Sequence, residues 1–264
     1  RQRQMCIRDS VTTALERNQK KYQLQQKQLK DSEKREKYIC DRMKHGIEKN
    51  LKATAQAFLA VREGYREGIS SGELFGIFLR EIRERLGDGG LQYDFLVGED
   101  TAAIDGVSKD RVLRKGDVLL FDVSAEYGGK WCDVSRTFFV GEPSEEQREV
   151  FGAVKESVRR GEEALKDGVT AGEIFAAAES AFVGRGKTLV HHAGRLVGAL
   201  PLAEPQFVRG SGERVRSGDL VAIESGLYGT FGVRLENDYL VTDHGAENLF
   251  APLMPLRIEE YILK

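Results

Sequence analysis

The chain has 264 residues, enough to bury a substantial core as one large domain or two small ones. Its hydrophobic content of 41% and charged content of 31% are typical of a soluble globular protein, and its net charge of −2 gives no electrostatic basis for binding nucleic acid or an anionic membrane. No apolar run approaches the roughly 18 residues that a membrane span requires, and the three cysteines lack the spacing of a zinc or disulfide motif. We therefore expect a cytoplasmic protein that binds neither nucleic acid nor membrane.

Two N-terminal stretches differ in composition from the rest of the chain. Residues 1–10 resemble translated sequencing-adaptor sequence rather than natural protein, so we expect the natural start of the chain to be missing. Residues 11–40 are rich in Gln and Lys, and they predict a polar lead-in helix. The main domain is then expected over residues 41–264.

Helices are predicted by apolar periodicity and by capping residues. Between residues 38 and 64, apolar residues recur every four positions, which is the spacing of one helical face. These residues are Ile39, Met43, Ile47, Leu51 and Ala55. Residues 67–75 and 167–175 are near-copies, and in each a Ser or Thr followed three positions later by Glu predicts a capping box that begins a helix. Ser144 with Gln147 predicts a third such start.

The most informative feature is a segment that occurs twice, at residues 116–138 and 218–241. Each copy opens with Gly-Asp, continues with an apolar run of strand length that ends in an acid, and then has a Tyr-Gly turn and a second acid. We therefore predict two β-hairpins, each carrying a pair of carboxylates. The acids are Asp122 and Asp133 in the first copy, and Glu224 and Glu236 in the second.

The register of the first hairpin follows from its turn. If Gly128-Gly129 is a two-residue loop, Asp133 lies opposite Ser124, whose side chain is on the same face as Asp122. The two aspartates are then diagonal neighbours about 7–8 Å apart, close enough to bind a common cation. We expect the second hairpin to repeat this arrangement less tightly, because its connecting segment is longer.

Four carboxylates in one pocket repel one another unless a cation lies between them. Two unit charges about 4 Å apart interact by roughly 4 kcal/mol even at an effective dielectric constant of about 20. Hard divalent cations prefer such oxygen ligands. Because helices precede the strands in both copies, we expect an internally duplicated α+β domain packed about a pseudo-two-fold axis, with the acids where the halves meet. Four unrelated surface acids are the alternative.

The hairpins resemble those of the pita-bread metallopeptidases, which include methionine aminopeptidase, aminopeptidase P, prolidase and the related creatinase. Residues 133–138, DVSRTF, are similar to the Asp-x-Ser/Thr-Arg-Thr-Phe segment of the aminopeptidase P and prolidase branch. Residues 223–228, IESGLY, resemble Glu-Pro-Gly-x-Tyr with Ser225 in place of proline, and residues 232–236, GVRLE, fit Gly-x-Arg-x-Glu. The resemblance covers residues 44–264. It implies a pita-bread fold, with a curved mixed or antiparallel sheet and helices on the outside.

The resemblance also implies a metal site whose ligands are two Asp, one His and two Glu. Here the acids would be Asp122, Asp133, Glu224 and Glu236, with Glu224 also acting as general base. The ion would be manganese, cobalt or zinc, in one or two copies, or in none if the site is degenerate.

The histidines of the family pattern are replaced in this chain. Alignment of the surrounding glycines places Arg195 at the His ligand position, and a guanidinium has no lone pair to offer a metal. Leu202 stands where a catalytic histidine is expected, and Asp105-Gly106 where another would fall. Of the two metal positions, only the one formed by Asp122, Asp133 and Glu236 is then intact.

Four further polar residues of the region are candidates for the pocket. Arg195 either forks against Glu224 in the vacated position or turns outward over the surface. His192 lies three residues from Arg195, on the opposite face of a regular strand, so we expect it to be a hydrogen-bonded pocket residue rather than a ligand. Arg234 shares a face with Glu236 and is expected to orient it, and Tyr228 is expected in the same pocket.

The sequence therefore predicts an aminopeptidase P-like or prolidase-like enzyme that hydrolyses a peptide bond of Xaa-Pro type, or an amide bond, with a carboxylate-bound divalent metal. One alternative is an inactive relative that binds peptides or proteins, which Arg195 and Leu202 favour. Another is a metal-free hydrolase resembling creatinase, which the missing histidines disfavour. The expected partner is a peptide or small amide substrate, and a homodimer is an arrangement that the sequence leaves open.

Overall fold

The structure is a computed structural model that describes residues 32–200 and 203–264, so the predictions for residues 1–31 and for Leu202 lie outside it. The chain divides into two units, Arg1–Arg42 and Met43–Lys264, and all the strands lie in the second. The helices are α2 (Ser32–Gly64), α3 (Ser71–Leu86), α4 (Glu145–Ala164) and α5 (Ala171–Val183), with the 3-10 turns η1 (Gly98–Ala102) and η2 (Ile258–Tyr261). The strands are β1 (Leu91–Val97), β2 (Val118–Tyr127), β3 (Lys130–Val140), β4 (Gly194–Leu196), β5 (Ala203–Gln206), β6 (Leu220–Tyr228), β7 (Gly232–Thr242), β8 (Gly245–Asn248) and β9 (Ile262–Leu263).

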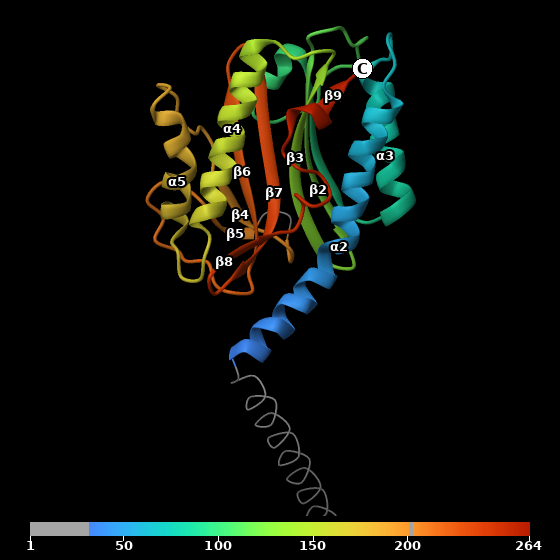
Figure 1. The fold of residues 1–264 in the computed structure, drawn as a ribbon. Coiled ribbons are helices and arrows are strands. Elements are labelled where there is room, and N and C mark those ends of the chain that lie inside the picture. The colour runs from blue at the N-terminus through green and yellow to red at the C-terminus, as the bar shows by residue number, and fades with distance from the viewer. Residues whose placement is uncertain (1–31, 201–202) are drawn as a thin grey trace, which may run out of the picture. The chain divides into compact units, whose positions relative to one another are not determined.

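The strands form two sheets, with the order β1-β2-β3-β9 in one and β5-β4-β6-β7-β8 in the other. All neighbours are antiparallel except β3 and β9. Figure 1 shows the sheets in the middle of the domain, with α4 and α5 on one outer side and α3 with the C-terminal part of α2 on the other. This arrangement confirms the predicted α+β class with helices on the outside. Within the described ranges, no helix combines the length and apolar character that crossing a membrane requires.

The internal duplication extends to individual hydrogen bonds. The N–H of Gly116 donates to Val140 O at 2.8 Å, and the N–H of Gly218 donates to Val241 O at 2.9 Å. Both glycines have φ of 92°, a conformation that residues with a Cβ rarely adopt. In each half the aspartate after the glycine accepts a hydrogen bond of 2.7 Å from the backbone N–H three residues earlier. The Gly-Asp dipeptide therefore marks the same tight turn into the same strand in both halves.

The helix starts follow the predicted capping residues, with one difference. Complete capping boxes are present at Ser144 with Gln147 and at Thr170 with Glu173. Ser70 caps α3 by accepting a hydrogen bond from the Glu73 N–H at 3.2 Å, but the Glu73 side chain pairs with Arg66 instead of returning to the cap. The predicted capping box at the start of α3 is therefore only half formed.

The two halves fill their cores differently. Phenylalanine rings of α2, α3 and the first sheet pack against one another, and the central rings of Phe58, Phe121 and Phe138 meet in edge-on or tilted contacts. In the second half α4 approaches β6 so closely that a Cβ added at Gly161 would lie 2.8 Å from Ile223 Cγ2. The helices α2 and α3 pack on the outer face of one sheet, and α4 and α5 pack on the outer face of the other. The central strands of the two halves therefore contact each other.

Candidate active site

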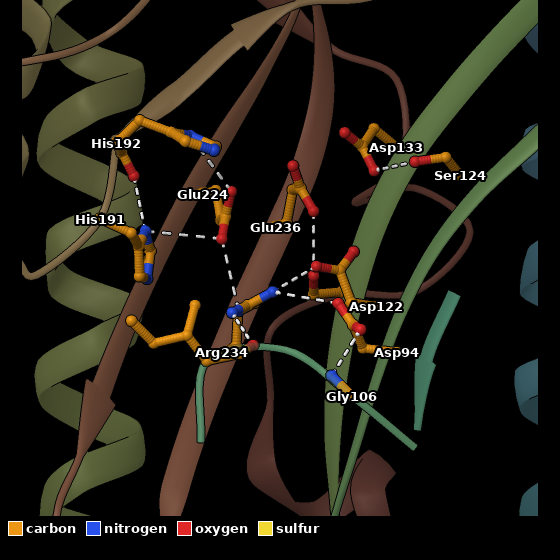
Figure 2. Close-up of polar contacts among 12 residues, drawn as sticks. Asp94, Gly106, Asp122, Ser124, Asp133, His191, His192, Glu224, Arg234 and Glu236 are labelled. Atoms are coloured by element: carbon orange, nitrogen blue, oxygen red, sulfur yellow. Dashed lines mark hydrogen bonds and ion pairs between the residues drawn. The ribbon is translucent and has the colours of Figure 1, made fainter. Parts of the chain in front are cut away.

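The four predicted carboxylates lie on the central strands of each half. Asp122 and Asp133 are on β2 and β3, and Glu224 and Glu236 are on β6 and β7. Figure 2 shows their side chains gathered around a common centre. Oxygen atoms of Asp122, Asp133 and Glu236 lie within 4.8 Å of one another. The halves are joined directly at this point, because Ser135 Oγ on β3 donates to Glu236 Oε2 at 2.9 Å.

The first hairpin has the predicted register and the second does not. Gly128-Gly129 form a two-residue turn, so Asp133 lies opposite Ser124, whose hydroxyl donates to Asp133 Oδ1 at 2.8 Å. In the second hairpin the turn has three residues, and Glu224 lies directly opposite Glu236. The expectation of a looser, diagonal pair there is wrong, because one extra turn residue shifts the register and brings the two glutamates face to face.

Arg234 is a buried residue that links carboxylates of both halves. Its guanidinium pairs with Asp122, and its Nε is 3.3 Å from Glu224 Oε1. The same Nε donates to the Tyr228 hydroxyl at 2.8 Å. The prediction that Arg234 orients Glu236 is wrong, because Glu236 turns toward β3 while the guanidinium extends toward Asp122 (Figure 2).

Arg195 points into the site and not over the surface. Its side chain is only 10% exposed and pairs with Asp133, and its Nη1 is 3.2 Å from His192 Nε2. The predicted ion pair of the Arg195 guanidinium with Glu224 is wrong. Other donors already surround that carboxylate, so the guanidinium crosses instead to the aspartate of the opposite half.

Two imidazoles reach the site from the segment before β4, where only His192 was expected in the pocket. The Nδ1 atoms of His191 and His192 are 3.5 and 3.4 Å from the two oxygens of Glu224 (Figure 2). His192 was expected on the face opposite Arg195, and this is wrong because β4 begins only at Gly194, so the alternation of a regular strand does not apply to residue 192. His191 Nε2 also lies 3.1 Å from the hydroxyl oxygen of Tyr228, which places that tyrosine beside the cluster.

The electrostatics separate the carboxylates into two groups. Burial raises the pKa of Asp133 to about 7, although the Arg195 guanidinium acts to lower it. Burial and the neighbouring charge of Asp133 raise the pKa of Glu236 well above its ordinary value. Glu224 differs: burial acts to raise its pKa, but the electrostatic interactions with His191, Arg234 and the other neighbouring basic side chains outweigh burial and hold the pKa at about 2. Asp133 and Glu236 are therefore the carboxyl groups whose ionisation the protein stabilises least, whereas Glu224 stays ionised.

Three buried polar atoms of this cluster, Glu236 Oε1, Asp238 Oδ1 and Arg195 Nε, lack a hydrogen-bond partner in the described structure, and the first of them lies among the candidate metal ligands. Glu236 Oε1 is buried and has no hydrogen-bond partner among the residues that the structure describes. A buried carboxylate oxygen without a donor is costly, because its desolvation is not offset. Together with the nearby oxygens of Asp122 and Asp133, it forms a three-carboxylate set of the kind that holds a hard cation. These residues therefore fit a divalent metal ion.

Sequence reasoning missed two further acids. Asp94 on β1 pairs in register with Asp122, and its Oδ1 accepts from the N–H of Gly106 at 2.8 Å (Figure 2). Asp238 is fully buried behind Asp133, whose N–H donates to it at 3.1 Å. Burial raises the pKa of Asp238 well above its ordinary value. Strand alternation was the available signal, since residue 238 shares a face with residue 236.

A pocket of about 280 Å³ opens onto this cluster. Asp122, Glu224, His192 and Arg195 lie on its inner side. Tyr93, Ile104 and Asp105 line it at the segment where the family pattern has a histidine. Ile104 contributes its carbonyl oxygen, which accepts a hydrogen bond from Arg234. The cluster is thus reachable by a small ligand.

Two duplicated halves of this topology, with carboxylates from both at one centre, define a pita-bread fold with a candidate metal site. The chain belongs to metallopeptidase family M24, whose family model matches residues 45–243. The predicted family and fold are therefore confirmed. The substitution of the family's histidine by Arg195 stays an inference from sequence.

Known proteins of this kind resemble the chain over most of its length. It is 30% identical over 209 residues to the Xaa-Pro dipeptidase of Pyrococcus furiosus, and the aligned segment covers 77% of this chain and 60% of that protein. It is 34% identical over 142 residues to a probable dipeptidase, PepE, of Mycobacterium tuberculosis, covering 52% of this chain and 38% of that protein.

Solved structures give the same result. The prolidase from Pyrococcus furiosus superimposes with a TM-score of 0.73 at 28% identity, over 78% of this chain and 63% of that chain. The X-Pro aminopeptidase from Thermotoga maritima MSB8 does so with a TM-score of 0.73 at 25% identity, over 78% of this chain and 60% of that chain. The chain therefore spans about 60% of the length of the Pyrococcus furiosus relative.

Proposed function

We propose that the chain carries the catalytic site of a metal-dependent peptidase that cleaves short peptides of Xaa-Pro type. The observation that supports this most strongly is the set of buried carboxylates on β2, β3 and β7, where Glu236 Oε1 lacks a protein partner. The similarity to dipeptidases and prolidases supports the substrate class. A cytoplasmic location and a homodimer stay predictions from the sequence.

Asp122, Asp133 and Glu236 would hold the metal. Their ligand atoms are all carboxylate oxygens, a set that suits manganese better than the more nitrogen- and sulfur-seeking zinc. Cobalt is the intermediate case. When bound, the ion would supply a polarised substrate carbonyl and a water molecule of lowered pKa.

Glu224 would act in proton transfer rather than in metal binding. Its two oxygens already face His191, His192 and Arg234 at 3.3–3.5 Å, and its pKa of about 2, which burial would raise but these neighbours lower, keeps it ionised. A carboxylate with so low a pKa is a weak base by itself. We assign proton acceptance to Glu224 backed by His192, whose own pKa burial lowers, so that the imidazole is neutral and can take the proton onward.

The pocket beside this cluster suits a short peptide. Its volume of about 280 Å³ lies at the lower end of the range for small-molecule sites. Tyr93 and Ile104 offer apolar surface for a side chain or a proline ring, and His192 and Arg195 offer polar groups for the peptide backbone. These features favour a dipeptide or tripeptide over a long chain.

The test is hydrolysis of a panel of Xaa-Pro dipeptides by the full chain supplied with manganese, cobalt or zinc. We expect turnover that chelation abolishes, and we expect Glu224→Gln to lower kcat at least 100-fold while manganese still binds. Glu163→Gln is the matched control, because that glutamate is exposed and pairs only with the surface residue Arg159. A protein that binds manganese but cleaves no dipeptide of the panel would contradict the proposal.

The second candidate function is an inactive relative that binds peptides. The ion pair between Arg195 and Asp133 favours it, since a guanidinium already engages one of the candidate ligands. In this case calorimetry would show an Xaa-Pro dipeptide bound and recovered intact. Turnover of the same dipeptide would exclude it.

A further inference from the structure

A guanidinium group is built into the carboxylate cluster. Arg195 extends from β4, which approaches β6 so closely that a Cβ added at Gly194 would lie 1.9 Å from Ala222 O. This close pairing fixes the point from which the side chain enters. The guanidinium pairs with Asp133, whose side chain is 1% exposed, so it is held inside the cluster and not at its rim.

The charges around the site leave room for one divalent cation. Four carboxylates, those of Asp122, Asp133, Glu224 and Glu236, face two guanidinium groups, which pair with Asp133 and with Asp122 and Glu224. With these six groups ionised, two negative charges stay uncompensated, and the carboxyl groups of Asp94 and Asp238 lie beside them. A divalent ion would offset this charge in a buried site, where unpaired charge is expensive.

The position of the orphaned oxygen indicates where that ion would lie. Asp122, Asp133 and Glu224 each contact at least one cationic side chain within the described part of the chain, whereas Glu236 receives only the hydroxyl of Ser135. Its second oxygen lies among the oxygens of Asp122 and Asp133. A cation there would gain three ligands without displacing a protein donor from Glu236.

The second cluster of metal-type ligands is unsuitable in this arrangement. His191, His192 and Glu224 bring ligand atoms within 4.8 Å of one another. However, His191 Nδ1 is 2.7 Å from the His192 carbonyl oxygen, so this nitrogen carries hydrogen and has no lone pair for a cation. His192 Nε2 in turn faces the guanidinium of Arg195 at 3.2 Å. His192 Nδ1 accepts a hydrogen bond from the Gly194 N–H at 3.2 Å, so both imidazoles have their ring nitrogens engaged by protein groups where a second ion would lie.

We infer that Arg195 is the resident second cation of this site, and that the chain binds a single divalent ion between Asp122, Asp133 and Glu236. The inference rests on the proposed metal-dependent function only for the identity of the ligands. Arg195 is a positioning residue in this account: it fixes Asp133 and lowers the affinity for the ion by electrostatic repulsion.

The experiment counts metal on the full chain and does not depend on turnover. The wild-type protein is dialysed against manganese, its metal content is measured by mass spectrometry, and the spectrum of the bound ion is recorded by electron paramagnetic resonance. We expect one manganese per chain and the six-line signal of an isolated ion. Two ions per chain with an exchange-coupled signal, or no bound ion, would overturn the inference.

A variant tests the role of the charge. Arg195→Met keeps much of the side-chain length and removes the guanidinium, so we expect one manganese bound at least tenfold more tightly. The control is Arg159→Met on the outer face of α4, which should leave the affinity unchanged. If Arg195→Met binds manganese no more tightly than the wild type, Arg195 does not lower the affinity by electrostatic repulsion. If the variant does not fold, the number of manganese ions per wild-type chain still tests the inference. A chain that binds one manganese ion but hydrolyses no dipeptide would uphold this inference and refute the proposed peptidase activity. A chain that binds two manganese ions and hydrolyses a dipeptide would refute this inference and uphold the proposed activity.

Discussion

Arg136 is the residue whose replacement we expect to destabilise the domain most specifically. It lies on β3 next to the carboxylate cluster and is fully buried, yet no carboxylate pairs with it among the described residues. All its N–H groups are used by uncharged acceptors at 2.6–2.8 Å. These are the Tyr261 hydroxyl, the carbonyl oxygens of Ser135, Glu236 and Met254, and the Asn237 side chain. The guanidinium thus joins β3, β7 and the C-terminal segment.

The cost of Arg136→Lys can be worked from these bonds. A lysine offers three donors where the arginine offers five, so at least two buried acceptors lose their partner. Each buried group left unsatisfied costs about 1–3 kcal/mol, which gives about 2–6 kcal/mol for the substitution. One of the five acceptors is the backbone carbonyl of Glu236, so this proposed metal ligand should also lose its fixed position.

The assay is urea unfolding of the metal-free protein, followed by fluorescence and circular dichroism. Arg159→Lys is the matched control, since the same chemical change there affects only exposed ion pairs, which are worth about 0–1 kcal/mol. We expect the Arg136→Lys midpoint to fall well below that of the control. Equal midpoints for the two variants would show that the buried hydrogen bonds do not stabilise the junction of the halves.

Three further predictions concern the site and its surroundings. Metal-free protein should lose stability as the pH rises from about 4 to about 7. Burial raises the folded-state pKa of Asp133 to about 7 and that of Glu236 well above its ordinary value, so the folded state holds protons that the unfolded chain has already released. Unfolding at pH 5 and pH 7.5 measures this loss, and a rise in stability over that interval would contradict it. Gly194→Ala should lower the unfolding free energy by at least about 1–3 kcal/mol, because φ is 131° there and the added Cβ would meet the backbone of β6, and an unchanged thermal midpoint would contradict the close strand pairing. Tyr228→Phe removes a hydroxyl that accepts from a buried arginine, so thermal unfolding should show a loss of about 1–3 kcal/mol and dipeptide assays a reduced kcat, whereas wild-type values in both would show that the hydroxyl is dispensable.

Local sequence signals predicted the fold and the placement of the acids. The Gly-Asp turns, the apolar runs and the alternation of strand side chains are short-range features, so the first hairpin could be placed in register down to the pair of Ser124 with Asp133. The turn Gly128-Gly129 determined that register. The second turn carried no comparable signal, and its extra residue changed the pairing of Glu224 with Glu236.

The partners of the charged side chains could not be predicted in this way. Arg195 and Arg234 each reach across to an aspartate of the opposite half, and such long-range pairs depend on how the two sheets pack. His191 and His192 enter the site from irregular backbone before β4, where no strand period applies. Arg136 lies in the DVSRTF segment, but nothing in the sequence shows that its hydrogen-bond partners would include the backbone carbonyls of Glu236 and Met254, which are 100 and 118 residues away in the chain.

The most direct test of the shared carboxylate site is the effect of manganese on unfolding. An ion that binds only the folded state at one hundred times its Kd should stabilise the protein by about 2.7 kcal/mol. We expect this stabilisation in the wild-type protein and its loss in Glu236→Gln, which removes the charge of the proposed ligand whose second oxygen has no partner in the described structure. Equal stabilisation of both proteins, or none in either, would contradict a cation site at the junction of the two halves.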